Sequence, residues 1–186
     1  MNQVNMLERT EIRLAGEGGQ GMILAGIILA EAAAIYDGKK AVQSQSYGPE
    51  ARGGASKAEV IISDNDIDYP EVIQADILLM LSQEAYNKYG GTVKEGGLVI
   101  IDTSNVQGIT STTAVRLPIT EIAKEITGRA ITANTVALGA LVALTGLVSK
   151  DAISQAVLAR APKGTKEMNQ AALEAGFEAA QKLKVS

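Results

Sequence analysis

The chain has 186 residues and a formal net charge of −4 at pH 7, and it contains neither cysteine nor histidine. Without these two residue types it cannot form a disulfide, a thiolate nucleophile, a Cys-ligated iron–sulfur cluster or a Ser-His-Asp triad. The acidic balance and an aromatic content of 3% also argue against a nucleic-acid surface, which needs basic patches and stacking rings. A binding module, or one part of a larger enzyme, is the expected class.

Length and composition predict one domain over residues 1–186, with residues 1–10 as a loose polar extension. The N-terminus lacks the apolar run of a signal peptide. The most apolar stretch, Thr135 to Val148, is interrupted by glycines and a threonine and is shorter than the roughly 20 residues of a membrane span. We therefore expect a cytoplasmic protein with no membrane partner and a buried core helix in this stretch.

The first predicted strand, Glu11 to Ala15, leads into a glycine-rich turn and then a helix over Met22 to Ala34. The turn has the G-x-G-x-x-G spacing at which backbone bends tightly and phosphates can approach. A helix N-terminus carries unpaired N–H groups that favour an anion. The alternative is a tight turn that needs small residues only for packing. The candidate ligand contacts in this glycine turn are Gly16, Gly18, Gly19, Gln20 and Gly21.

The second predicted strand, Lys40 to Ser44, tests whether the turn belongs to a dinucleotide site. An NAD-binding unit places an acidic residue near the end of this strand, about 20 residues past the glycines, to bind the adenosine ribose. Here the strand ends in glutamine and serine, and Asp37 lies before it. The sequence thus lacks the ribose-binding acid of an NAD enzyme.

A second glycine-rich segment follows this strand and carries one tyrosine, one glutamate and one arginine. Loops on a rigid scaffold are where binding residues concentrate, so we predict a ligand or subunit contact, with a plain surface turn as the alternative. Arg52 could bind a phosphate or carboxylate through two hydrogen bonds, or pair with Glu50 or a partner subunit. The candidate residues are Ser46, Tyr47, Gly48, Glu50, Arg52, Gly53 and Gly54.

The rest of the chain predicts further alternation of strands and helices. We expect strands over 56–63, 76–81, 98–101 and 114–117 and helices after Ser82, from Pro118 to about Thr127, and over 135–148, 151–158 and 166–182. Asn134 is expected to cap the core helix, with ligand contact as the alternative. This pattern predicts an α/β fold, a Rossmann-like three-layer α/β/α sandwich with a mainly parallel sheet and a helical C-terminal tail.

The two glycine-rich segments together resemble the gamma subunit of 2-oxoacid:ferredoxin (acceptor) oxidoreductases. The resemblance covers Gly16 to Gly21 with the small residues after it, and the string Gln45-Ser-Tyr-Gly-Pro-Glu-Ala-Arg-Gly-Gly54. It continues through the strand at Asp76 to Leu81, the start of the core helix at Asn134, and the Asn169 region, so it spans most of the chain. The glycine turn alone is a weak signal, whereas the longer string at its distance downstream is specific.

The resemblance implies membership of a multisubunit enzyme that converts a 2-oxoacid and coenzyme A to an acyl-CoA and CO2. It implies alpha and beta subunits and a ferredoxin-like delta subunit as partners, with electrons passing to ferredoxin through iron–sulfur clusters. Thiamine diphosphate then sits mainly on the beta subunit, and this chain holds no catalytic residue and no metal but contributes to coenzyme A binding. A stand-alone gamma subunit of this kind is somewhat more similar to the 2-oxoglutarate enzymes than to the pyruvate, branched-chain or indolepyruvate enzymes.

Three hypotheses about function are therefore consistent with the sequence. The first is a non-redox gamma subunit of a 2-oxoacid oxidoreductase, inactive when isolated. The second is a stand-alone nucleotide-binding Rossmann-like protein, which the missing ribose-binding acid disfavours. The third is an assembly scaffold that binds no ligand.

Overall fold

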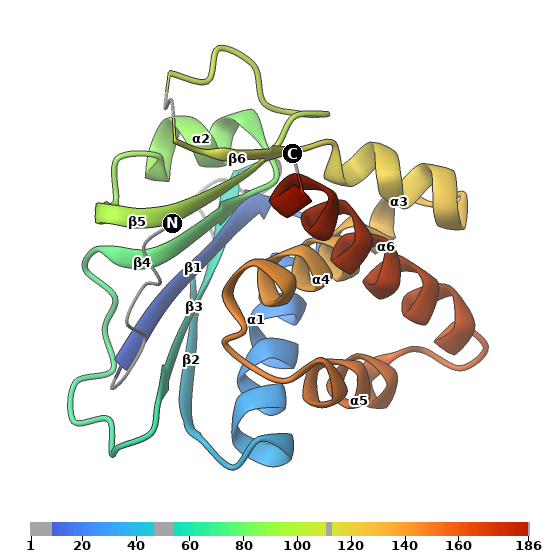
Figure 1. The fold of residues 1–186 in the computed structure, drawn as a ribbon. Coiled ribbons are helices and arrows are strands. Elements are labelled where there is room, and N and C mark those ends of the chain that lie inside the picture. Colours follow the sequence, from blue (N-terminus) through green and yellow to red (C-terminus); the bar gives the residue numbers. More distant parts are fainter. Residues whose placement is uncertain (1–8, 47–53, 111–112, 186) are drawn as a thin grey trace.

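The computed structural model describes residues 9–46, 54–110 and 113–185, and it contains a single six-stranded sheet in the order β2-β3-β1-β4-β5-β6 (Figure 1). The strands are β1 (Arg9–Glu17), β2 (Lys40–Ser46), β3 (Ala55–Ser63), β4 (Ala75–Met80), β5 (Val93–Asp102) and β6 (Val115–Leu117). β1 lies near the centre of the sheet, between β3 and β4. The loop that follows β1 therefore lies near the middle of the sheet, at the edge formed by the strand ends.

The sheet is mixed because of one strand. β1, β4, β5 and β6 pair in parallel, whereas β3 runs antiparallel to both of its neighbours, β1 and β2. Parallel neighbours need a crossover connection, while antiparallel neighbours can follow one another directly. β2 and β3 are joined by residues 47–54, and this connection is too short for a crossover helix. The α/β class and the prevalence of parallel pairing are confirmed, and β3 is the antiparallel exception.

The helices cover the two faces of the sheet unequally (Figure 1). α2 (Gln83–Tyr89) lies on one face, against β1, β3 and β4. The opposite face carries α1 (Met22–Glu31), α3 (Ile119–Thr127), α4 (Ala133–Thr145), α5 (Lys150–Arg160) and α6 (Lys166–Val185). The C-terminal helices thus build most of one layer.

Each face of the sheet has its own apolar core. The larger core joins alternate residues of the strands, such as Ile12 and Leu14, to buried residues of the five helices, such as Leu141 and Leu173. The smaller core lies under α2 and includes Leu78, Met80 and Ile101. Because β4 contributes to both cores, it is buried on both faces, as its continuous apolar run predicts.

Most of the predicted helix boundaries agree with the structure, with two differences. α1 is followed directly by a π-helical turn, η1 (Ala32–Tyr36), before Asp37. A 3-10 turn, η2 (Ala130–Thr132), starts the core helix early, so that Thr132 occupies the N-cap of α4. The prediction that Asn134 occupies the N-cap is therefore wrong, because it lies within the first turn. None of the helices in the described part of the chain is both long and apolar enough to span a membrane.

Candidate functional site

The carboxyl ends of β1 and β4 form the topological switch point of the sheet. The two strands are parallel neighbours, but the helices that follow them, α1 and α2, pack on opposite faces (Figure 1). Their connections therefore diverge and leave a crevice at the sheet edge, which is where ligands bind in open α/β sheets. The predicted glycine turn lies at this point.

The glycine turn is held in a defined shape by Gln20. Its side-chain Oε1 accepts from the Glu17 backbone N–H at 2.7 Å, and its Nε2 donates to the Leu81 carbonyl, beyond the end of β4, at 3.1 Å. Gly19 and Gly21 have backbone φ values of 94° and 75°. Residues other than glycine adopt this left-handed region only at a cost in free energy. The predicted residues thus form one ordered turn tied to the neighbouring strand.

The start of α1 is suited to an anion. Gly21 occupies its N-cap without any side-chain cap, and its first turn contains no acidic residue. A Cβ atom at Gly18 or Gly19 would have no neighbour within 4 Å, so the approach to these two glycines is open. Unpaired N–H groups and the helix dipole favour negative charge at such an end.

Asn134 closes one side of the same turn. Its Nδ2 lies 3.4 Å from the Gly21 carbonyl oxygen, and its Oδ1 accepts from the Thr135 backbone N–H at 2.8 Å. Thr135 Oγ1 lies 3.1 Å from Asn169 Oδ1, and Asn169 Nδ2 donates to the Thr165 carbonyl at 2.9 Å. The first turns of α1, α4 and α6 are therefore joined by one polar chain. Asn169, whose region carried part of the resemblance, is its outer member.

The second glycine-rich segment reaches the same edge of the sheet. In the β1–β3 register Glu17 lies opposite Ala55, and Ser56 Oγ donates to the Gly16 carbonyl at 3.3 Å. Ser46 ends β2, and Gly54 is buried just before β3. The two predicted segments thus meet at their described ends. The candidates Tyr47, Gly48, Glu50, Arg52 and Gly53 lie outside the described residues.

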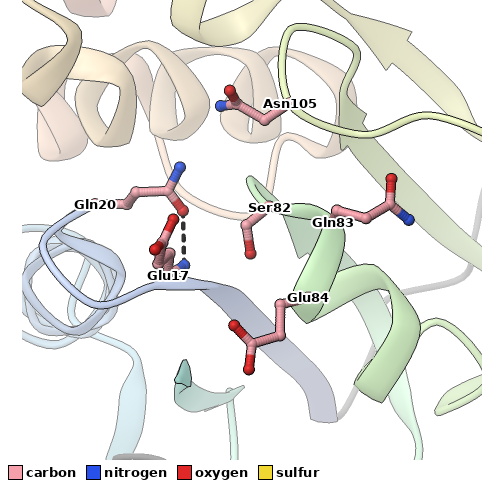
Figure 2. A pocket seen from close by; sticks show the side chains of 6 residues that line it. All are labelled: Glu17, Gln20, Ser82, Gln83, Glu84 and Asn105. Carbon is pink, nitrogen blue, oxygen red and sulfur yellow. Dashed lines mark hydrogen bonds between the residues drawn. The ribbon is translucent and has the colours of Figure 1, made fainter. Parts of the chain in front are cut away.

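A polar pocket of about 300 Å³ lies between the glycine turn and α2 (Figure 2). Its lining comes from the carboxyl end of β1 and from the segments that follow β1, β4 and β5, including the start of α2, and consists of Glu17, Gln20, Ser82, Gln83, Glu84 and Asn105. Ser82 caps α2 as predicted, because its Oγ accepts from the Ala85 N–H at 3.1 Å. The glycine turn thus contributes Glu17 and Gln20 to this pocket, while Gly21 contacts Asn134 of α4.

A buried carboxylate that the sequence analysis did not single out supports the pocket wall. Asp102 is completely buried at the end of β5, and its Oδ2 accepts from Asn105 Nδ2 at 3.0 Å and from Thr120 Oγ1 at 2.5 Å. Its Oδ1 accepts from the backbone N–H groups of Ser104 and Thr120 at 3.0 and 3.3 Å. The only signal in the sequence was an aspartate at the carboxyl end of a buried strand. Within the described residues, no group of three or more acidic side chains is placed to hold a metal ion.

Comparison with known proteins identifies relatives over nearly the whole chain. The family model for pyruvate ferredoxin/flavodoxin oxidoreductase matches residues 11–179. The 2-oxoglutarate synthase subunit KorC of Methanocaldococcus jannaschii is 52% identical over 98% of this chain and 100% of its own length. The pyruvate synthase subunit PorC of Methanothermobacter thermautotrophicus is 33% identical over 95% of this chain and 98% of its own.

Solved structures agree with these relatives. The gamma subunit of a keto/oxoacid ferredoxin oxidoreductase from Geobacter sulfurreducens has a TM-score of 0.84 and 54% identity, over 93% of this chain and 99% of its own. The 2-oxoglutarate:ferredoxin oxidoreductase of Magnetococcus marinus has a TM-score of 0.83 at 24% identity, over 94% of this chain and 31% of that one. The second match shows that the same fold occurs inside a longer chain.

Proposed function

We propose, from the premise that this chain belongs to the pyruvate ferredoxin/flavodoxin oxidoreductase family and is the gamma subunit of a 2-oxoacid:ferredoxin oxidoreductase, that its role in the complex is a non-redox one. It shapes part of the coenzyme A site, while partner subunits carry thiamine diphosphate and the iron–sulfur clusters. The composition supports this division, because a chain without cysteine has no thiolate ligands for a cluster. The partners are the alpha and beta subunits, with a ferredoxin-like delta subunit and ferredoxin completing the electron path.

The proposed reaction is the oxidative decarboxylation of 2-oxoglutarate with coenzyme A to succinyl-CoA and CO2, with two electrons passing to ferredoxin. The observation that carries this choice is the match to a 2-oxoglutarate synthase subunit over 98% of this chain and the whole of that subunit. The identity to a pyruvate synthase subunit is lower over a similar span. Pyruvate is therefore the second candidate substrate.

The residues around α1 fit a phosphate group of coenzyme A. The open Gly18–Gly19 segment and the uncapped first turn of α1 supply backbone N–H donors without a nearby acidic cap. Lys163, just before α6, and Lys166, its first residue, are both exposed and lie near Thr165, whose carbonyl accepts from Asn169 Nδ2. Ser46, Arg52 and Gly54 belong to the segment that leads to the same edge. Coenzyme A supplies the thiol that accepts the acyl group.

The polar pocket on the α2 side is the less suitable place for that phosphate. Glu17 and Glu84 both line it and would repel an anion at close range. We therefore assign the phosphate to the side of the glycine turn that faces Asn134. A pure assembly scaffold would need neither side to bind a ligand.

The test of the overall function is reconstitution with the partner subunits. The isolated chain is expected to show no turnover, and the complete complex is expected to reduce ferredoxin with 2-oxoglutarate and coenzyme A. Faster turnover of pyruvate than of 2-oxoglutarate by the same complex would contradict the substrate choice. Turnover by the isolated chain would contradict the non-redox role.

The coenzyme A assignment is tested separately in the assembled complex. The KM for coenzyme A is expected to rise in Arg52→Ala and in Lys163→Ala/Lys166→Ala, with the KM for the 2-oxoacid unchanged. Lys124→Ala on α3 serves as the control for loss of a positive charge. Equal KM values in all variants would favour the pure scaffold.

A further inference from the structure

The carbonyl group of Leu81 links the glycine turn to the loop after β5. Leu81 lies one residue beyond the end of β4, and its N–H donates to the Ala15 carbonyl at 3.0 Å. Its own carbonyl oxygen accepts from two side-chain amides, Gln20 Nε2 at 3.1 Å and Asn105 Nδ2 at 3.2 Å. A carbonyl oxygen has two lone pairs, so it can accept from both donors at once. The two amides come from segments that follow different strands, β1 and β5 (Figure 2).

Asp102 determines which end of the Asn105 amide faces Leu81. Asn105 Nδ2 lies 3.0 Å from Asp102 Oδ2 and 2.9 Å from Thr120 Oγ1. Asp102 is completely buried, and a carboxylate only accepts hydrogen bonds. The Thr120 hydroxyl donates to the same carboxylate oxygen at 2.5 Å, so its own oxygen can accept from Asn105. Turning the amide over would place Asn105 Oδ1 against the carboxylate and the Leu81 carbonyl. The amide nitrogen is therefore held toward Leu81, although Asn105 as a whole is exposed.

Gln20 extends this arrangement into the glycine turn. While its Nε2 donates to the Leu81 carbonyl, its Oε1 accepts from the Glu17 backbone N–H at 2.7 Å. A Cβ atom at Gly16 would lie 2.7 Å from the same Oε1, so the glycine at this position leaves the room that the amide occupies. A continuous chain of hydrogen bonds thus runs from the buried carboxylate of Asp102 to the backbone of the glycine turn.

We propose that Asn105 is a positioning residue for the glycine turn: it fixes the Leu81 carbonyl to which Gln20 donates, and Asp102 fixes Asn105. The consequence for turnover rests on the proposed binding of coenzyme A by this turn. A turn that is already ordered loses less conformational freedom when its ligand binds, so the ligand binds more tightly. Asn105 acts through Leu81 and needs no contact with the ligand. Its effect is therefore expected on the KM for coenzyme A and not on the chemical step.

Asn105→Ala tests this role in the assembled complex. The KM for coenzyme A is expected to rise roughly two- to tenfold, which is the effect of one neutral hydrogen bond on an equilibrium. The kcat and the KM for the 2-oxoacid are expected to stay the same. Asn87→Ala is the matched control, because Asn87 is an exposed asparagine on the neighbouring helix α2 and lies outside the pocket lining. Equal KM values for coenzyme A in these two variants, while Gln20→Ala raises it, would overturn the proposal.

The double variant Gln20→Ala/Asn105→Ala separates this role from a general loss of stability. Both side chains act through one carbonyl group, so the double variant is expected to raise the KM for coenzyme A no further than Gln20→Ala alone. Two independent effects would instead multiply in the double variant. A KM raised by the product of the two single effects would therefore overturn the proposal.

Hydrogen exchange on the full chain distinguishes failure of this proposal from failure of the coenzyme A assignment. The Glu17 N–H is expected to exchange faster in Asn105→Ala than in the wild type or in Asn87→Ala, because the Gln20 amide that accepts from it is less firmly held. Circular dichroism of each variant checks that the fold is kept. Unchanged exchange at Glu17 in Asn105→Ala would overturn the proposal. Faster exchange with an unchanged KM for coenzyme A in both Asn105→Ala and Gln20→Ala would overturn the coenzyme A assignment, and with it the role of Asn105 in turnover.

Discussion

Asn134 lies so close to Gly21 that the two residues cannot both carry a side chain in their present positions. A Cβ atom added to Gly21 would lie 2.6 Å from Asn134 Nδ2 and 3.1 Å from its Cγ. The pair joins the first turn of α4 to the N-cap of α1 across 113 positions of the sequence. The glycine in this turn is therefore required for packing as well as for its positive φ.

Gly21→Ala tests this contact. The left-handed backbone costs an alanine about 1–2 kcal/mol, and the clash with Asn134 adds about 1–3 kcal/mol. In an Asn134→Ala background the second contribution disappears, so the same change at Gly21 is expected to cost only about 1–2 kcal/mol. Urea unfolding of the four proteins of this double-mutant cycle gives both values. Strict additivity would show that Asn134 moves aside without cost.

The crossing of α4 and α6 depends on two further glycines. A Cβ atom at Gly139 would lie 2.2 Å from the Leu173 carbonyl oxygen, and one at Gly176 would lie 2.1 Å from the Val136 carbonyl oxygen. Backbone atoms cannot rotate away as a side chain can, so the helices themselves must separate. Because both helices belong to the larger core, their separation also opens packed apolar contacts.

Gly139→Ala and Gly176→Ala are each expected to destabilise the protein by about 3 kcal/mol or more, at the upper end of overpacking costs. The measurement is the free energy of unfolding in urea, or the loss of soluble folded protein where a variant fails to fold. Gly91→Ala is the control, because a Cβ atom there has no neighbour within 4 Å. Equal stability of the Gly91 and Gly139 variants would show that the helices are not in this close contact.

Local signals in the sequence predicted local structure well. Ser82 as the cap of α2 and Pro118 at the start of α3 depend on a few neighbouring residues, and both are confirmed. The direction of β3 and the register that brings Ser56 to Gly16 depend on pairing between distant segments. A single sequence contains no record of that pairing. The same reason explains why the glycine turn was recognised and the contact of Asn134 with Gly21 was not.

Asp102 shows what a buried acid can contribute without being part of the chemistry. Asp102→Asn replaces one acceptor oxygen by a donor that faces Thr120 and Asn105, which already donate to it. A buried donor without a partner costs about 1–3 kcal/mol, and hydrogen bonds to a charged group contribute about 1.5–3 kcal/mol. We expect the variant to lose about 2–4 kcal/mol of unfolding free energy.

Hydrogen exchange would locate that loss. The amides at the start of α3 are expected to exchange faster in Asp102→Asn, because Thr120 N–H donates to this carboxylate. Asp64→Asn, at an exposed aspartate after β3, is expected to change neither quantity. A change in stability without a change at α3 would place the role of Asp102 elsewhere. The sequence alone placed this aspartate at a strand end, but its partners come from two later segments.

Gln20 provides the prediction that links local order to function. Gln20→Ala removes both the acceptor for the Glu17 N–H and the donor to the Leu81 carbonyl. Each such bond contributes about 0.5–1.5 kcal/mol, so the loss of global stability is expected to be modest. The local effect is expected to be larger, because these two bonds fix the shape of the glycine turn. Exchange of the Glu17 amide is therefore expected to be much faster in the variant.

Gln20→Glu separates the two bonds, because it keeps an acceptor for the Glu17 N–H and loses the donor to Leu81. The Glu17 amide is expected to remain protected in Gln20→Glu and to lose protection in Gln20→Ala. In the assembled complex, Gln20→Ala is expected to raise the KM for coenzyme A more than it lowers kcat, since a mobile turn must be ordered when the ligand binds. A fall in kcat at unchanged KM would mean that the turn acts on the chemical step, and unchanged exchange at Glu17 would mean that other contacts hold the turn.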